Sequence, residues 1–184
     1  GWAEAWPRCR PIGHELPSCE RDRWVRFHSL PDSKRYADTA DEEAEVLRRH
    51  QVLLGELASR EEVLLLATAW SDSQEPAQLE NELAEVLPNA RYWTSVLREE
   101  DAGEEYWHHV YVSASSRRSA EVEGLLQLVA DDVTADVIIT SPDLEWLYHP
   151  YDGGADVIAH TTAARDEIRD RHTDWLPANP PVCR

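Results

Sequence analysis

The sequence contains no methionine, and no apolar run approaches the roughly 20 residues needed to cross a bilayer. No basic and hydrophobic leader is visible, so the sequence predicts no secretory signal. A glycine-rich phosphate turn and a nucleophile elbow are also missing, which argues against a P-loop nucleotide site and a serine hydrolase. Cysteine is scarce and odd in number, at three residues, which predicts a reducing cytoplasm and no disulfide framework.

Positive charge is the next shortage. The chain has 36 Asp and Glu against 18 Lys and Arg, a formal net charge of −18. Such a chain does not wrap nucleic acid, and an anionic membrane would repel it. It would attract a basic protein partner over a distance, although the simpler interpretation is that the charge serves solubility alone.

The length and the apolar content predict one globular domain. With 184 residues, 42% of them hydrophobic, the chain can bury a sizeable core. Residues 1–38 are predicted to be an irregular arm packed on the body, and residues 39–184 a single α+β domain. The expected fold is a mixed, largely antiparallel sheet of about five or six strands packed by three or four helices.

Hydrophobic periodicity and capping signals locate the expected elements. Thr39 and Glu42 form a capping box at the start of a helix, and Asp152-Gly153 between two apolar runs indicates a hairpin turn. Helices are predicted at 39–57, 76–87, 119–131 and 162–175. Strands are predicted at 63–70, 91–98, 106–114, 136–140, 144–149 and 155–160.

The C-terminal part carries a tyrosine-containing strand, a tight D-x-G-x-D turn, a short apolar strand and a helix that ends in an aspartate–tryptophan pair. The positions are Tyr148, Tyr151, Asp152, Gly154, Asp156, Val157, Asp174 and Trp175. In these features the last quarter of the chain resembles an uncharacterised bacterial family, domain of unknown function 3885. The resemblance implies the fold of this region and no particular activity, and Gly153 stands where the family often has arginine.

The only basic run in the chain, WVRFHSLPDSKRY at residues 24–36, is the first candidate site. Arg26, Lys34 and Arg35 would converge on a phosphate or carboxylate, because the guanidinium fork suits oxyanions and lysine adds a mobile charge. In the alternative interpretation, these cations pair with the chain's own carboxylates and clamp the arm to the body.

Neutral donors and a second stretch would complete an anion-binding pocket. The additional residues are His28 and Tyr36 in the basic run, and His149, Tyr151 and Asp152 in the predicted hairpin at 148–156. A histidine near an aspartate can serve in general acid–base catalysis. A pocket between residues 24–36 and 148–156 is therefore the basis of one functional hypothesis, an enzyme or ligand-binding domain.

Two further patterns involve histidine. Cys9, His14 and Cys19 have Cys-x4-His-x4-Cys spacing, so they are candidate zinc ligands that would still need a fourth ligand; the alternative is an arm with incidental cysteines. His108 and His109 are adjacent on a predicted strand and must point to opposite faces, so we expect one ring to pack and the other to be exposed.

No assembled catalytic set accompanies these patterns. The favoured hypothesis is therefore a non-enzymatic interaction protein that binds a basic partner, with an immunity-type inhibitor as one example. No cofactor is expected unless zinc binds at the cysteine pattern.

Overall fold

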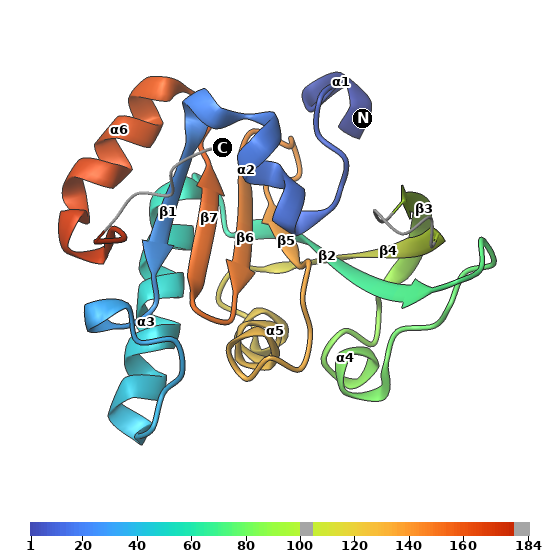
Figure 1. Ribbon diagram of the computed structural model, residues 1–184, viewed down its shortest axis with the longest axis horizontal. Coiled ribbons are helices and arrows are strands. Elements are labelled where there is room, and N and C mark those ends of the chain that lie inside the picture. Colours follow the sequence, from blue (N-terminus) through green and yellow to red (C-terminus); the bar gives the residue numbers. More distant parts are fainter. Residues whose placement is uncertain (100–104, 179–184) are drawn as a thin grey trace.

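The computed structural model describes residues 1–99 and 105–178, and its centre is a seven-stranded sheet (Figure 1). The strands are β1 (Trp24–His28), β2 (Glu62–Ser71), β3 (Arg91–Glu99), β4 (Glu105–Ser116), β5 (Ile138–Thr140), β6 (Leu147–Tyr151) and β7 (Gly154–Ile158). Their order across the sheet is β1-β7-β6-β5-β2-β4-β3, and each pairing among the described residues is antiparallel. The α+β prediction is confirmed, with more strands than expected and without the parallel pairing of a mixed sheet.

The described residues form six helices, and short hydroxyl side chains cap three of them. They are α1 (Trp2–Ala5), α2 (Leu16–Cys19), α3 (Ala40–Leu57), α4 (Asn81–Val86), α5 (Ala120–Ala130) and α6 (Thr162–Arg171), with short 3₁₀ turns at Gly13–Glu15, Arg21–Arg23, Pro31–Ser33 and Thr173–Trp175. The hydroxyls of Thr39, Ser119 and Thr161 accept backbone N–H groups at the starts of α3, α5 and α6. The predicted start of α4 at Pro76 is wrong, since Glu80 is the residue before its first turn.

The sheet has two covered faces, which we call the helix face and the arm face. Figure 1 shows α3, α4 and α5 on one side of the sheet and the N-terminal arm with α1 and α2 on the other, while α6 lies beside β1. Side chains alternate along each strand. In β7, Val157 belongs to the core on the helix face and Ile158 to the core on the arm face.

The N-terminal arm contributes a strand that the sequence analysis does not anticipate. Residues 24–28 form β1, which pairs with β7 from Trp24 opposite Ile158 to His28 opposite Gly154. Val25 and Phe27 are buried on the helix face, so their partners in alternation, Arg26 and His28, lie on the arm face. The basic run of the sequence is therefore an edge strand of the sheet followed by a loop.

The predicted hairpin joins β6 to β7 through Asp152 and Gly153. Gly154, the next residue, must lack a side chain, because a Cβ atom there would lie 2.0 Å from the carbonyl oxygen of Phe27 in β1. This close approach brings the loop after β1 against the tip of the hairpin. None of the helices in the described part of the chain has the length and apolar composition of a bilayer-spanning segment.

Candidate functional site

Most of the residues predicted to bind an anion meet where β1 packs beside the β6–β7 hairpin. Arg26 makes a bidentate ion pair with Asp156, with Nε–Oδ1 and Nη2–Oδ2 distances of 2.8 Å. Trp24 Nε1 donates to the same carboxylate at 2.7 Å, and Asp156 is only 1% exposed. The hydrogen bond to Asp156 raises the pKa of Arg26. Arg26 is therefore a permanent cation whose fork is already occupied.

Two side chains of β6 lie beside this ion pair. The ring of Tyr151 lies 5.0 Å from the Arg26 guanidinium, and burial raises the Tyr151 pKa to about 12. His149 is buried, and its Nδ1–H donates to the carbonyl of Val137 at 2.8 Å. Burial lowers the pKa of His149, so the ring is neutral. Gly13 of the arm covers this ring, since a Cβ atom on Gly13 would lie 2.3 Å from His149 Nδ1.

The hairpin tip holds the next ion pair. Arg35 Nη1 lies 3.3 Å from Asp152 Oδ2, and the Tyr36 hydroxyl donates to the same oxygen at 2.5 Å. This hydrogen bond raises the pKa of Tyr36, because it stabilises the protonated phenol beside a carboxylate.

Lys34 points elsewhere, toward the start of α3. Its Nζ lies 2.7 Å from Asp38 Oδ2 and 2.7 Å from Glu42 Oε2, and these hydrogen bonds raise the lysine pKa. His28 faces the arginines instead: burial and then Arg26 lower its pKa, which disfavours its charged form. The structure therefore brings Arg26, His28 and Arg35 together and separates Lys34 from them.

The cations of the basic run are thus paired internally, as the alternative interpretation expects. Arg26, Lys34 and Arg35 each contact a carboxylate. An anion at this corner would have to displace Asp156 or Asp152, and truncating such a charge pair leaves a desolvated charge behind. The geometry does not favour an anion-binding pocket between the two predicted stretches.

A cavity does open next to the hairpin tip, between α3 and α5, and we call it the acidic cavity. Its volume is about 220 Å³. Three carboxylates line it, from Glu43, Asp131 and Asp152, against the single guanidinium of Arg35. A cation suits such a lining better than an anion does. Asp152 and Arg35 are among the residues predicted from the sequence. Glu43 and Asp131 are not, because they are exposed residues of α3 and of the turn after α5, and they meet only through the packing of the two helices.

The acidic lining continues past the end of α5. Trp70 and Val133 are 37% and 43% exposed, and both line a shallow depression together with Glu80 and Glu82. Asp131 lies two residues before Val133, so the two depressions share one turn. We call the acidic residues that line these two hollows, with the neighbouring Asp132 and the exposed Trp70 and Val133, the acidic band: Glu43, Glu80, Glu82, Asp131, Asp132 and Asp152.

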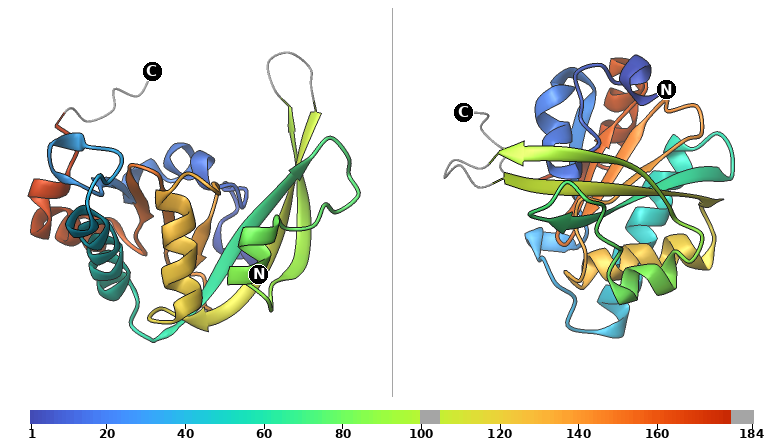
Figure 2. Two further views of the ribbon diagram at one scale, coloured as in Figure 1. Left: turned by 90° about the horizontal axis from the view of Figure 1, so that it is seen from below. Right: turned by 90° about the vertical axis from the view of Figure 1, so that its right-hand side faces the viewer.

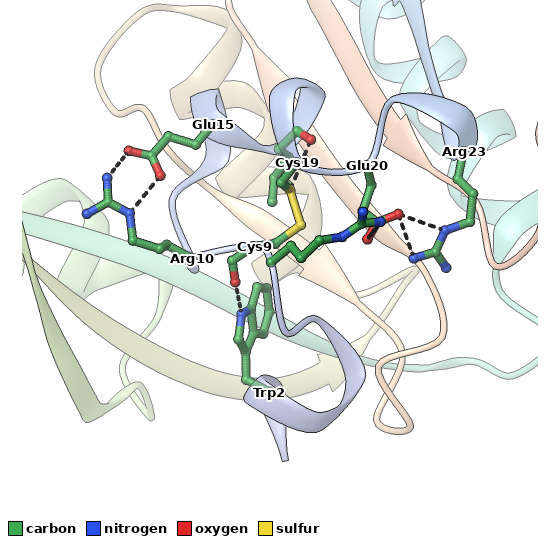
Figure 3. Close-up of a disulfide and its surroundings, with 9 residues drawn as sticks. Trp2, Cys9, Arg10, Glu15, Cys19, Glu20 and Arg23 are labelled. Atoms are coloured by element: carbon green, nitrogen blue, oxygen red, sulfur yellow. Dashed lines mark hydrogen bonds and ion pairs between the residues drawn. A yellow bond between two sulfur atoms is a disulfide. The ribbon is translucent and has the colours of Figure 1, made fainter.

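The cysteine pattern of the arm forms a disulfide, between Cys9 and Cys19 (Figure 3). This contradicts the prediction of an arm without disulfides. It also contradicts the zinc hypothesis for Cys9, His14 and Cys19, because both sulfurs are bonded to each other and neither is a free thiolate. Trp2 Nε1 donates to the carbonyl of Cys9 at 2.7 Å, which fastens the start of α1 to the same loop.

His14 instead joins the arm to the sheet through Asp136. Its Nδ1 lies 2.6 Å from Asp136 Oδ1, and its backbone N–H donates to the same oxygen at 3.0 Å. Burial works to raise the pKa of Asp136, but the contacts with His14 outweigh it, so the pKa is lowered. Asp136 has a φ of 55°, a left-handed conformation that aspartate tolerates better than most residues. No motif in the sequence marks Asp136, since its partner is 122 residues away.

The prediction that one ring of the His108–His109 pair is exposed is wrong. The two residues are 3% and 0% exposed, because β4 lies inside the sheet and both of its faces are covered there. His109 contacts the hydroxyls of Ser71 and Ser95, each at 2.7 Å. His108 Nδ1 has no hydrogen-bond partner among the described residues and lies 3.8 Å from Asp136 Oδ2. These rings are structural parts of the sheet.

Comparison with known proteins identifies one family. The sequence model described as Domain of unknown function (DUF3885) matches residues 12–180. The match is much longer than the C-terminal quarter in which the motif resemblance lies, and it includes β1 and most of the arm after Cys9. No curated protein matches the chain, and no solved structure matches it. Because the matched region is far more than half of its length, the chain belongs to the DUF3885 family.

Proposed function

We propose that this chain is a non-enzymatic interaction domain that binds a basic protein partner through the acidic band. The observation that carries the proposal is the uneven use of charge. Arg26, Lys34 and Arg35, which would repel a basic partner, are each held by a carboxylate of the same chain. Among the described residues, Asp152 is the one carboxylate of the acidic band that a Lys or Arg nitrogen approaches within 4.0 Å, and that nitrogen belongs to Arg35.

The stretch from residue 61 to residue 90 contains seven acidic residues and no lysine or arginine. In this segment Asp72, Glu75, Glu80, Glu82 and Glu85 are exposed, and no Lys or Arg nitrogen in the described ranges lies within 4.0 Å of their carboxylates. Unpaired carboxylates on one surface raise the local concentration of a cationic partner and speed its association.

Exposed apolar groups within the band supply an anchor for the partner. Tryptophan is enriched among interface residues that dominate binding energy, and Trp70 sits beside Glu80 and Glu82. The acidic cavity next to this anchor has room for the end of a lysine or arginine side chain. An inhibitor that neutralises a basic toxin, as immunity-type proteins do, is one function that fits this surface.

The compartment of the partner follows from the arm. The disulfide between Cys9 and Cys19 favours an oxidising compartment, which replaces the cytoplasmic location expected from the cysteine count. A search for partners should therefore include extracytoplasmic basic proteins.

A charge-matched pair of variants tests the proposal. The band variant carries Glu80→Gln, Glu82→Gln, Asp131→Asn and Asp132→Asn. The control variant removes four exposed carboxylates outside the band, through Asp22→Asn, Glu62→Gln, Glu145→Gln and Asp174→Asn. Both variants have the same net charge, so general attraction between the chain and a polycation is equal in the two.

The measurement is fluorescence anisotropy with a hexa-arginine peptide, followed by affinity capture from the source organism with the same three proteins. We expect the band variant to bind the peptide about tenfold more weakly than the control variant at low salt, and to lose its captured partner. Equal binding by the two variants, or a captured partner that the band variant retains, would contradict the proposal.

A further inference from the structure

A second depression lies in the same helix layer, between α3 and the start of α5, and we call it the arginine depression. Its volume is about 520 Å³. Arg48, Arg117 and Arg118 line it, together with Leu47, Val52 and the carboxylate of Glu123. Three guanidinium groups around one hollow are unexpected in a chain with a net charge of −18.

The carboxylates near these arginines are shared. Glu45 contacts both Arg48, at 2.7 Å, and Arg49, at 2.6 Å. Glu61 lies 2.7 Å from Arg117 and 3.9 Å from Arg118. A guanidinium has five N–H donors and a carboxylate accepts about four hydrogen bonds, so the shared carboxylates leave donors unused.

Arg117 is the best positioned of these donors. Its side chain is only 14% exposed, and its buried Nε has no hydrogen-bond partner in the described part of the chain. Gly55 in α3 packs against it, since a Cβ atom there would lie 3.2 Å from Arg117 Nη1. In the described part of the chain, Glu61 takes a hydrogen bond from Nη2, and Nη1 has no acceptor, so an oxyanion can bind at Nη1 without displacing Glu61.

We propose that the arginine depression binds a small molecule in which a phosphate or carboxylate group is joined to an apolar body. The oxyanion takes the side of Arg117 and Arg118, away from Glu123, because the planar forks of arginine hold such groups through paired hydrogen bonds. The apolar body lies on Leu47 and Val52. The volume falls within the usual range of small-molecule sites, roughly 300–1,000 Å³.

This inference does not depend on the proposed basic partner, because the two sites have linings of opposite charge and separate residues. Calorimetric titration of the purified chain tests it, with phenyl phosphate, benzoate, inorganic phosphate and benzyl alcohol as probes. We expect saturable binding of phenyl phosphate, benzoate or both, and much weaker binding of inorganic phosphate and of the uncharged alcohol. This result would show that binding needs both the positive charge of the arginines and the apolar contacts with Leu47 and Val52.

The variant for this test is Arg118→Gln, whose side chain is 71% exposed and so is not needed for folding. Its matched control is Arg8→Gln, which removes an arginine of 73% exposure from the arm. We expect Arg118→Gln to weaken binding of the aromatic anion about tenfold and Arg8→Gln to leave it unchanged. No saturable binding by the native chain, or equal weakening by the two variants, would overturn the proposal.

Discussion

Two hollows of opposite chemistry, which we call the acidic end and the arginine end, lie beside α3 and α5 in the helix layer. The two helices lie side by side (Figure 2, left). Glu43 of α3 shares the acidic cavity with Asp131, which directly follows α5. Val52 of α3 shares the arginine depression with Arg118, which lies just before α5. The two helices therefore run in opposite directions, and one pair of helices presents a carboxylate-rich site and a guanidinium-rich site.

Several of the charged residues around the two hollows have the sign that the dipole of α5 disfavours. The helix N-terminus is partly positive, yet Arg117 and Arg118 directly precede the capping residue Ser119. The C-terminus is partly negative, yet Asp131 and Asp132 follow the last turn. Charges placed to stabilise the helix dipole would have the opposite signs, so the dipole does not account for the positions of these four residues.

The substitution with the largest expected effect should disrupt the acidic end and the arginine end together. Leu54 of α3 is fully buried against the sheet, and Leu54→Ala should lower the free energy of unfolding by about 2–5 kcal/mol. Urea denaturation measures this loss. If the two ends belong to one packed unit, binding of hexa-arginine and of phenyl phosphate should disappear at the same urea concentration. Val133→Ala, at an exposed position, is the control and should change stability by no more than about 0.5 kcal/mol.

A second substitution should lower the stability of the fold without changing binding at either end. The disulfide lies on the arm face, and Cys9→Ser removes a cross-link between residues 10 positions apart, which should cost about 2–3 kcal/mol. Thermal unfolding with and without reductant measures the loss. The acidic end should keep its affinity for hexa-arginine and the arginine end its affinity for phenyl phosphate under native conditions, because both lie on the helix face of the sheet. Selective loss of one affinity would show that the arm supports that end.

Third, Glu45→Gln at the arginine end should lower the free energy of unfolding more than Glu43→Gln at the acidic end. The substitution leaves Arg49, whose side chain is 7% exposed, without its carboxylate, and this loss should cost about 2 kcal/mol. Glu43→Gln in the acidic cavity should cost no more than about 0.5 kcal/mol, because Glu43 is exposed. Urea denaturation of both variants at pH 7 makes the comparison, and equal losses would contradict it.

The contacts of Glu45 with Arg48 and Arg49 also make the stability of the fold depend on pH. The hydrogen bond from Arg48 lowers the pKa of Glu45 from 4.5 to about 2, with Arg49 adding to the effect. A lowered pKa in the folded state contributes stability above the unfolded value of 4.5, and this contribution is lost as the pH falls toward 2. The difference in stability between the native chain and Glu45→Gln should therefore shrink between pH 5 and about 2, and a difference that stays constant would contradict the assignment.

The smallest expected effects test the dipole argument. Asp131→Asn and Arg118→Gln each remove a charge that the dipole of α5 disfavours, so each should raise the free energy of unfolding by about 0.3–0.5 kcal/mol at low ionic strength. Precise urea titrations in low salt and in 0.5 M salt, where the Debye length is about 4 Å, would measure the gain and its reduction by screening. A loss of stability in low salt would mean that these charges support the fold.

Much of the fold could be predicted from local sequence. The capping hydroxyls of Thr39 and Ser119 set the starts of α3 and α5, and Asp152-Gly153 marks the turn between β6 and β7. These signals work because each depends on residues only a few positions apart. The edge strand β1 was not predicted, because its proline-rich and basic surroundings resemble a loop and its pairing with β7 joins residues more than 100 positions apart.

The candidate sites were predictable only in part. Residues Arg35, Tyr36 and Asp152 were selected from the sequence and do meet at one cavity, but its net charge depends on Glu43 and Asp131. The arginine depression has no sequence signature, since Arg48 and Arg118 come from different helical regions. The side-chain pairs could not be predicted either. No local pattern in the sequence shows that Arg26 forms an ion pair with Asp156 or that Cys9 forms a disulfide with Cys19.

The sequence by itself determined the class of fold, the positions of most helices and strands, and the negative charge, because these depend on composition and on patterns within one element. Only the tertiary structure decided which charges are neutralised and which are left for other molecules. The physical reason is that an ion pair forms when two side chains come within about 4 Å, and the packing of α3 against α5 and of β1 against β7 sets those distances.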